Sequence, residues 1–402
     1  MPRFKYSGRD NKGKNDGAIT SKSRREAIVS LKEQGIKVIQ MEEVPESFLT
    51  KEITIGNPVK LQDFVVYLRQ FSTLIRAGVT VVESTKILAN QTESKHLQRV
   101  LFEVEEELRQ GNALSEATSK HPKVFTPMFV NMIRAGEASG TLDETLDRLA
   151  TQFEKQHETK QKIVSALTYP AVLGFVAVGV IIFLLVGVVP TFVSMFSDFG
   201  ADLPIITKLV LGASEWMQKL WWLIILLFIG AIVGLSVVKS KKETKYYLDY
   251  FLLRMPVFGN LLKKAAIARL TRTLSSLFAS SVPILPAIGM VEKIVENEVI
   301  SEVLAQSKKS LEKGESLTEP MKDHWAFPPL VTQMISIGEN TGSLDTMLEK
   351  IAVFYEKEVD AATDRLKSLI EPLMIVVLAV IVGTIVTAIM VPMFDIFNHI
   401  NP

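Results

Sequence analysis

The sequence lacks cysteine altogether, and this absence excludes several kinds of chemistry. A chain without cysteine forms no disulfide, offers no thiolate nucleophile, and cannot ligate zinc or an iron–sulfur cluster through sulfur. It also lacks a surplus of either charge, because 45 Lys and Arg face 44 Asp and Glu. Nucleic-acid binders need a basic surface for phosphates, so we expect no direct contact with nucleic acid.

Patterns typical of enzymes are missing as well. No glycine-rich stretch ends in Gly-Lys-Ser or Gly-Lys-Thr, as the P-loop of a nucleotide-binding enzyme does. The five histidines are scattered along the chain. The stretch 136–140 resembles the nucleophile elbow of hydrolases, but Ser139 stands one position late and no strand is predicted before it. We therefore predict a protein that is not an enzyme and that binds no cofactor.

Three long apolar runs are present instead. Residues 171–189, 221–238 and 373–391 contain no charged side chain. At about 1.5 Å per residue, a helix of that length crosses a hydrocarbon core of roughly 30 Å. The alternative is three buried helices of a soluble protein, which rarely run so far without a charge. The runs predict three transmembrane helices.

Flanking charges predict the orientation of these helices. The segments before the first run, after the second and before the third are rich in Lys and Arg, whereas residues 190–220 carry only Lys208 and Lys219, and 392–402 carry none. Because positive residues stay on the cytoplasmic side, the N-terminus is predicted to be cytoplasmic and the C-terminus outside. The polar start of the chain predicts no cleaved signal peptide.

The chain contains an internal duplication at a shift of 202–203 residues. The matched pairs include Ser72 with Ser275, Gly111 with Gly314, Met132 with Met334, Glu154 with Glu356, Pro170 with Pro372, and Pro190 with Pro392. Each copy is a helical domain followed by an apolar run, and 221–238 has no counterpart. This unmatched run is predicted to return the chain across the membrane, so that the repeats are parallel.

Together these patterns predict an all-α integral membrane protein in which a six-helix cytoplasmic bundle with its following transmembrane helix occurs twice. The predicted segments are a small ββαβ module at 1–45, a linker at 46–58, the first bundle at 59–169, span one at 171–189, an extracytoplasmic loop with an interfacial helix at 190–220, span two at 221–238, a cytoplasmic connector at 239–262, the second bundle at 263–371, span three at 373–391 and an outer tail at 392–402.

Helix ends within the repeat carry recognisable signals. Thr80 and Glu83 form a predicted capping box, Thr126 is a predicted N-cap followed by Pro127, and the stretch 141–144 is a second predicted capping box. Pro170 and Pro190 bracket the first span, as Pro372 and Pro392 bracket the third, and we expect a kink at the membrane surface at Pro170.

The repeated Gly-Glu-x-x-Gly stretches are the candidate structural or interaction sites, at Gly136, Glu137 and Gly140 and at Gly338, Glu339 and Gly342. We expect the first glycine to end one helix and the second to allow the turn into the next. The carboxylates of Glu137 and Glu339 suit a structural role, because the helix dipole stabilises negative charge near a helix N-terminus. The alternative is a hard-cation site with Glu137 and Glu83 as oxygen donors.

Small residues four apart suggest close helix packing in the membrane. They are Gly230 and Gly234 in the second run, and Ala379, Gly383 and Thr387 in the third. The alternative is that they are ordinary small residues facing lipid. The runs contain no ionisable residue, which disfavours an ion-coupled transporter.

These features resemble the inner-membrane platform proteins of type IV pilus and type II secretion machines, the PilC/GspF family. The resemblance rests on Phe4-Lys5-Tyr6, Gly13, Gly17, Gln34-Gly35, the stretches 136–142 and 338–344, Tyr169-Pro170, Glu371-Pro372 and Val391-Pro392-Met393-Phe394. It implies a bacterial inner-membrane protein that couples a cytoplasmic hexameric ATPase to the polymerisation of pilin or pseudopilin subunits.

The resemblance also implies a homo-oligomer, a dimer, that contacts other inner-membrane assembly proteins. A membrane scaffold or receptor of another complex is the alternative, and a transporter is a weaker one.

Overall fold

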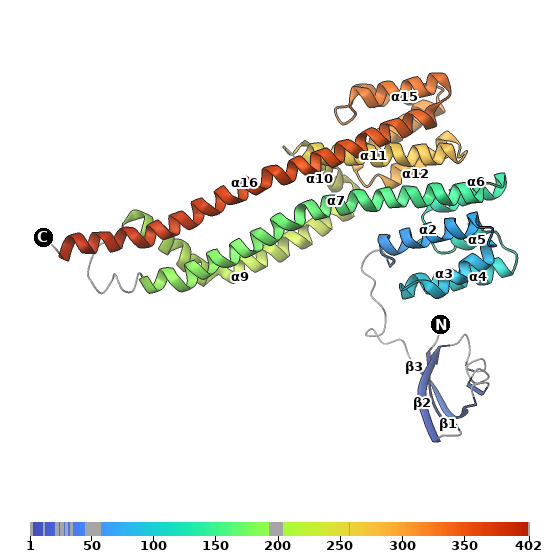
Figure 1. The fold of residues 1–402 in the computed structure, drawn as a ribbon, viewed down its shortest axis with the longest axis horizontal. Helices are drawn as coiled ribbons and strands as arrows, with labels where there is room; N and C mark the ends of the chain where they lie inside the picture. Colours follow the sequence, from blue (N-terminus) through green and yellow to red (C-terminus); the bar gives the residue numbers. More distant parts are fainter. Residues whose placement is uncertain are drawn as a thin grey trace. The chain divides into compact units, whose positions relative to one another are not determined.

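The computed structural model describes residues 3–10, 13–20, 24, 28, 31–32, 35–44, 58–192, 204–256 and 258–400. The chain divides into two units, Met1–Pro58 and Val59–Pro402. The first unit contains a sheet and the second is helical throughout its described elements (Figure 1). The predicted linker 46–58 lies almost wholly outside the described residues.

The N-terminal unit contains a three-stranded antiparallel sheet in the order β2-β1-β3. Its strands are β1 (Arg3–Asp10), β2 (Gly13–Thr20) and β3 (Lys37–Val44). The first two strands pair along their whole length, from Arg3 opposite Thr20 to Asp10 opposite Gly13. Phe4 and Met41 are buried on the sheet with Leu31 and Ile36. Most of the residues between β2 and β3, where the helix of the predicted ββαβ module falls, lie outside the described residues.

Two described segments of the second unit contain helices in the same order. The first holds α2 (Leu61–Arg76), α3 (Val81–Gln91), α4 (Lys95–Arg109), α5 (Leu114–Ser119), α6 (Pro127–Ser139) and α7 (Leu142–Phe183). The second holds α11 (Phe258–Ala279), α12 (Ile284–Ile294), α13 (Glu298–Glu312), α14 (Glu319–Lys322), α15 (Pro329–Thr341) and α16 (Leu344–Ile400). Each set ends in a very long helix.

Local signals account for several of these helix ends. The Thr80 side chain accepts a hydrogen bond from the Glu83 N–H, which confirms one of the two bonds of the predicted capping box. Thr126 accepts one from the Phe129 N–H with proline following it, so this predicted N-cap is confirmed. The predicted capping box at 141–144 is wrong, because the Thr141 side chain makes no capping bond to α7. Its hydroxyl lies 2.7 Å from the Ser139 hydroxyl instead.

The prolines do not separate the bundles from the membrane runs. Pro170 lies inside α7, which continues through the short π-helix η1 (Leu184–Val188) to Phe192. Pro372 and Pro392 likewise lie inside α16. The prolines bracket the apolar runs in the sequence, but Pro170, Pro372 and Pro392 do not end a helix, and the kink expected at Pro170 stays a prediction. The helix tolerates proline where the missing backbone bond can be compensated locally.

Between the two sets lie α9 (Ile205–Ser240) and α10 (Lys242–Arg254). α9 bends at Leu220, whose φ of −119° and ψ of 15° are not helical. Its first half packs against the far ends of α7 and α16: Val210 is buried with Leu185 and Ile385, and the Thr207 hydroxyl donates to the Ala388 carbonyl at 2.7 Å. The described part of the predicted outer loop thus packs on the spans.

Two helical stretches among the described residues are long and apolar enough to cross a membrane, Leu142–Phe192 and Leu344–Val391. They hold the first and third predicted spans. The second, 221–238, lies in the part of α9 after its bend and stays a prediction. α7 and α16 lie side by side in the same direction (Figure 1). Lys162 bonds Asp360 at 2.7 Å, and Gly174 lies beside Met374.

Candidate functional site

The Gly-Glu-x-x-Gly stretches form the tight connections from α6 to α7 and from α15 to α16. Gly140 and Gly342 have φ angles of 72° and 69°. This is the left-handed conformation that glycine commonly adopts just after the end of a helix. The Thr141 N–H donates to the Gly136 carbonyl at 2.9 Å, and the Ser343 N–H donates to the Gly338 carbonyl at 3.0 Å. The turning role predicted for the second glycine is consistent with this geometry.

The first glycine of each stretch has a different role from the one expected. Gly136 lies inside α6 and Gly338 inside α15, so neither ends its helix. A Cβ atom at Gly136 would lie 2.6 Å from the Thr145 hydroxyl, and one at Gly338 would lie 2.9 Å from the Leu344 Cα. Each glycine therefore allows the long helix to approach the preceding one closely.

The glutamates of the two stretches cap a neighbouring loop. The Ser115 N–H, at the start of α5, donates to both carboxylate oxygens of Glu137 at 3.3 and 3.4 Å. The Leu317 N–H donates to Glu339 at 2.9 Å, and the Ser316 hydroxyl donates to it at 2.6 Å. The carboxylates thus satisfy backbone N–H groups of buried residues, but on a different segment from the helix that follows them in sequence.

The cation alternative gains no support from the described residues, which show no grouping of three or more His, Asp or Glu that could hold a metal. Glu83 is exposed in the first turn of α3, and Glu137 is engaged with the Ser115 N–H. The Ser139 hydroxyl donates to the Ala135 carbonyl at 2.9 Å on the surface of α6. Its surroundings are those of a helix-end serine.

A repeated ion pair that sequence analysis missed joins the first and last helices of each set. Arg69 on α2 donates from Nε to Glu154 on α7 at 2.6 Å. Arg272 on α11 donates to Glu356 on α16 at 2.8 and 2.9 Å, and this pair is bidentate like the pair of Arg69 and Glu154. Glu154 and Glu356 were already matched in the duplication. Arg69 and Arg272 lie 203 residues apart, within the 202–203 shift of the duplication, and this is the signal that could have revealed the partners.

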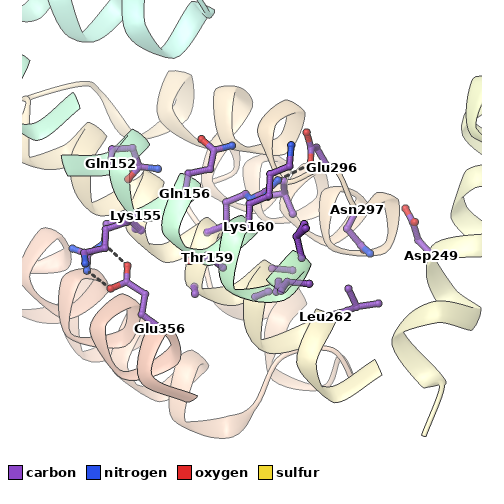
Figure 2. Close-up of a pocket in the computed structure, with 18 of the residues that line it drawn as sticks. Gln152, Lys155, Gln156, Thr159, Lys160, Asp249, Leu262, Glu296, Asn297 and Glu356 are labelled. Atoms are coloured by element: carbon purple, nitrogen blue, oxygen red, sulfur yellow. Dashed lines mark hydrogen bonds and ion pairs between the residues drawn. The ribbon is translucent and has the colours of Figure 1, made fainter. Parts of the chain in front are cut away.

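A cavity of about 300 Å³ lies where α7, α10, α11 and α16 meet (Figure 2). Its charged lining residues are Lys155, Lys160, Asp249, Arg269, Arg272, Glu296 and Glu356. Arg272 pairs with Glu356, and Arg269 pairs with Glu296 at 2.7 Å. The charged side chains that line the cavity thus largely neutralise one another. This favours a contact zone between the two sets of helices over a site for a charged ligand.

The small residues of the third run line a shallow groove that faces the start of α9. Ala379, Gly383 and Thr387 share this groove with Ile206 and Leu209. Added Cβ atoms at Gly230, Gly234 and Gly383 would have nothing within 4 Å in the described structure. Close packing of another helix at the second-run glycines therefore stays a prediction.

Comparison with known proteins identifies the family. The sequence matches the family "Type II secretion system (T2SS), protein F" twice, over residues 67–190 and 270–392. Residues 1–42 match the N-terminal domain of the same family. The two long matches coincide with the two copies of the duplication, and together they cover more than half of the chain.

Curated relatives are similar over almost their whole length. The type IV pilus assembly protein PilC of Thermus thermophilus is 38% identical over 100% of both chains, and PilC of Pseudomonas aeruginosa is 37% identical over 92% of this chain and 98% of its own. The type II secretion system protein F of Aeromonas hydrophila is 32% identical over 94% of this chain and 98% of its own. The resemblance stated from the sequence is therefore confirmed: this membrane protein belongs to the type II secretion system protein F family, which includes the PilC proteins of type IV pilus assembly.

Proposed function

We propose that this chain is the inner-membrane platform of a type IV pilus or type II secretion-like machine, coupling a cytoplasmic hexameric ATPase to the polymerisation of pilin or pseudopilin subunits. The observation that carries the proposal is the full-length similarity to PilC and protein F relatives. The chain acts as a homo-oligomer, a dimer, and contacts other inner-membrane assembly proteins. The N-terminus and both bundles lie in the cytoplasm, and the C-terminus lies outside.

The architecture supports a mechanical role. The last helix of each bundle continues without a break into an apolar segment, so movement of a cytoplasmic bundle and movement of its span are coupled. The described residues include no group of three or more candidate metal ligands, and the expected spans contain no ionisable side chain. An enzyme or an ion-coupled transporter would place chemistry in a cleft or at the membrane midplane.

Co-purification tests the proposal. The full chain, tagged and extracted from its own membranes in mild detergent, should retain an assembly ATPase of the hexameric type and a pilin-like subunit. The matched control is an unrelated three-span protein with the same tag and expression level. Recovery of a different complex without either partner would favour the scaffold alternative and contradict the platform function.

A further inference from the structure

We propose that the exposed face of α15 and α16 in one copy packs on the exposed face of α2 and α3 in a second copy. This contact repeats between chains the one that the two sets of helices make within a chain. The inference rests on the homo-oligomer of the proposed function and adds its interface: a head-to-tail contact between two different surfaces.

The contact within the chain is defined by polar bonds from the first set of helices to the second. Gln152 of α7 is 4% exposed; its side-chain N–H donates to the Thr273 hydroxyl of α11 at 2.9 Å, and it accepts from the Ser276 hydroxyl at 3.2 Å. Asn131 of α6 lies 3.4 Å from the sulfur of Met290 on α12. The covering elements are thus α6 and α7, and the covered elements are α11 and α12.

The duplication assigns each of these residues a counterpart at the free ends of the molecule. The offset is 203 from α2 to α11 and 202 from α7 to α16, as the two matched ion pairs Arg69–Glu154 and Arg272–Glu356 show. The counterpart of Gln152 is therefore Phe354, and the counterpart of Thr273 is Gln70. If α15 and α16 covered a second copy, Phe354 would meet Gln70.

Exposure differs sharply between the counterparts. Met128 on α6 is 3% exposed, whereas its counterpart Leu330 on α15 is 41% exposed. Phe354 is 45% exposed where Gln152 is buried. On the other side Thr273 is buried within the chain, but Gln70 is exposed. The residues buried where the two sets of helices meet thus have counterparts that are exposed on the outer faces of the first and second sets.

The bare surfaces have the composition of an interface. The face on α15 and α16 carries four exposed apolar side chains, Leu330, Ile337, Val353 and Phe354. The face on α2 offers Val66, which is 48% exposed, next to polar Gln70. Exposed apolar side chains that include a phenylalanine, facing a mixed surface, are typical of a contact between subunits.

The relation between the two sets of helices allows the contact to recur in one membrane. α7 and α16 run in parallel, and contacts between them join residues 198 and 200 apart, as at Lys162–Asp360 and Gly174–Met374. These offsets lie close to the offset of the duplication, so the sets are related mainly by rotation about the helix direction. Heterologous contacts close into a ring when the repeated rotation closes, and two chains would be the smallest ring that covers both faces of each copy.

Cross-linking between two tagged chains tests the interface, and the cysteine-free sequence provides a clean background. One chain carries Phe354→Cys and the other Gln70→Cys, and both are expressed together in membranes and treated with a short bifunctional maleimide. We expect a product that carries both tags. Cross-linking that joins only like variants, Phe354→Cys to itself or Gln70→Cys to itself, would overturn the head-to-tail contact.

A charge variant tests whether the face holds the oligomer together. Phe354→Glu should shift the purified full chain from dimer to monomer mass by light scattering, and Gln70→Lys in the same chain should restore the dimer. Phe102→Glu on α4 is the matched control, since Phe102 is 41% exposed; it should leave the mass unchanged. A Phe354→Glu chain that stays dimeric would refute the interface, even if the ATPase still co-purifies and the platform function stands.

Discussion

Gly136 and Gly140 show how one residue type fulfils two physical requirements four positions apart. Gly140 supplies a left-handed backbone with open space around it, whereas Gly136 supplies the absence of a side chain where α7 approaches. Substitutions at the two positions therefore fail for different reasons. At Gly140 the cost is backbone strain, and at Gly136 it is a steric clash with Thr145.

Gly140→Val should destabilise the chain by about 1–3 kcal/mol, because a β-branched residue is strained at a φ of 72°. Ser139→Ala, the neighbouring control, should change stability by less than about 0.5 kcal/mol, since it removes only exposed contacts. Melting temperature, protein level and piliation or secretion should be measured together. Loss of function in Ser139→Ala at normal protein level would contradict the non-enzymatic interpretation.

Gly136→Ala should lower the melting temperature, and Thr145→Ala in the same chain should recover part of the loss, because it removes the hydroxyl 2.6 Å from the new Cβ. Gly338→Ala should resist such rescue. Its closest neighbour is the Leu344 Cα, a backbone atom that no substitution removes. Equal rescue by Met347→Ala at the second site would show that the helices separate freely there.

His324 should make the second set of helices sensitive to acid. Burial lowers the pKa of His324, and its Nδ1 accepts from the Ala326 N–H at 3.3 Å, which requires the neutral ring. With a folded pKa below the unfolded value of about 6.5, stability is full above that pH and is lost as the pH falls through the folded pKa. His324→Gln should flatten the fall in melting temperature between about pH 7 and pH 5. An unchanged fall in this variant would contradict the role of His324.

At the scale of helices, the two repeated ion pairs differ in how far their side chains are exposed to solvent. Arg272 and Glu356 are 14% and 19% exposed, against 38% and 29% for Arg69 and Glu154. α7 lies over the former pair at the cavity. The Arg–Glu ion pair is thus less exposed to solvent in the second set of helices than in the first.

Arg272→Met should therefore cost roughly 2 kcal/mol or more, since it leaves a partly buried carboxylate unpaired. Arg69→Met should cost about 1 kcal/mol or less, because solvent screens the more exposed pair. Chemical unfolding of both variants and the parent in the same detergent checks the order. A larger effect at Arg69 would mean that the first set of helices depends on the pair for its helix arrangement.

Signals that act within one helical turn were predictable from the sequence, and contacts between distant segments were not. The caps at Thr80 and Thr126 depend on a side chain and a backbone N–H three residues later, so residue type and spacing suffice. Thr141 carries the same pattern but fails, because its hydroxyl meets the Ser139 hydroxyl. The close approach at Gly136 and the capping by Glu137 depend on tertiary packing that periodicity does not encode.

The whole molecule's orientation is testable because the native chain has no cysteine. Single cysteines at Asn11, Ser310 and Asn398 should react differently with an impermeant maleimide in intact cells or spheroplasts. Only Asn398→Cys should be labelled, since flanking Lys and Arg predict an outer C-terminus. Labelling of Ser310→Cys under these conditions would overturn the predicted topology; lysed membranes provide the control for reactivity.

The duplication predicts a second whole-molecule property: residues 60–168 and 263–370 should superpose as bundles of one connectivity. The matched ion pairs and the matched left-handed glycines support this expectation. An experimental structure with different helix order in the two segments would contradict it.

The continuous helices through Pro170 and Pro372 join each helical bundle to its apolar run, so that each long helix can act as a lever. Leu142–Phe192 is a 51-residue helical stretch, about 75 Å long at about 1.5 Å per residue. In the predicted topology, with the bilayer as the pivot, tilting the cytoplasmic arm in one direction would swing the outer tip in the opposite direction. The first half of α9, packed on the tips of both levers, would then be squeezed or released with each stroke.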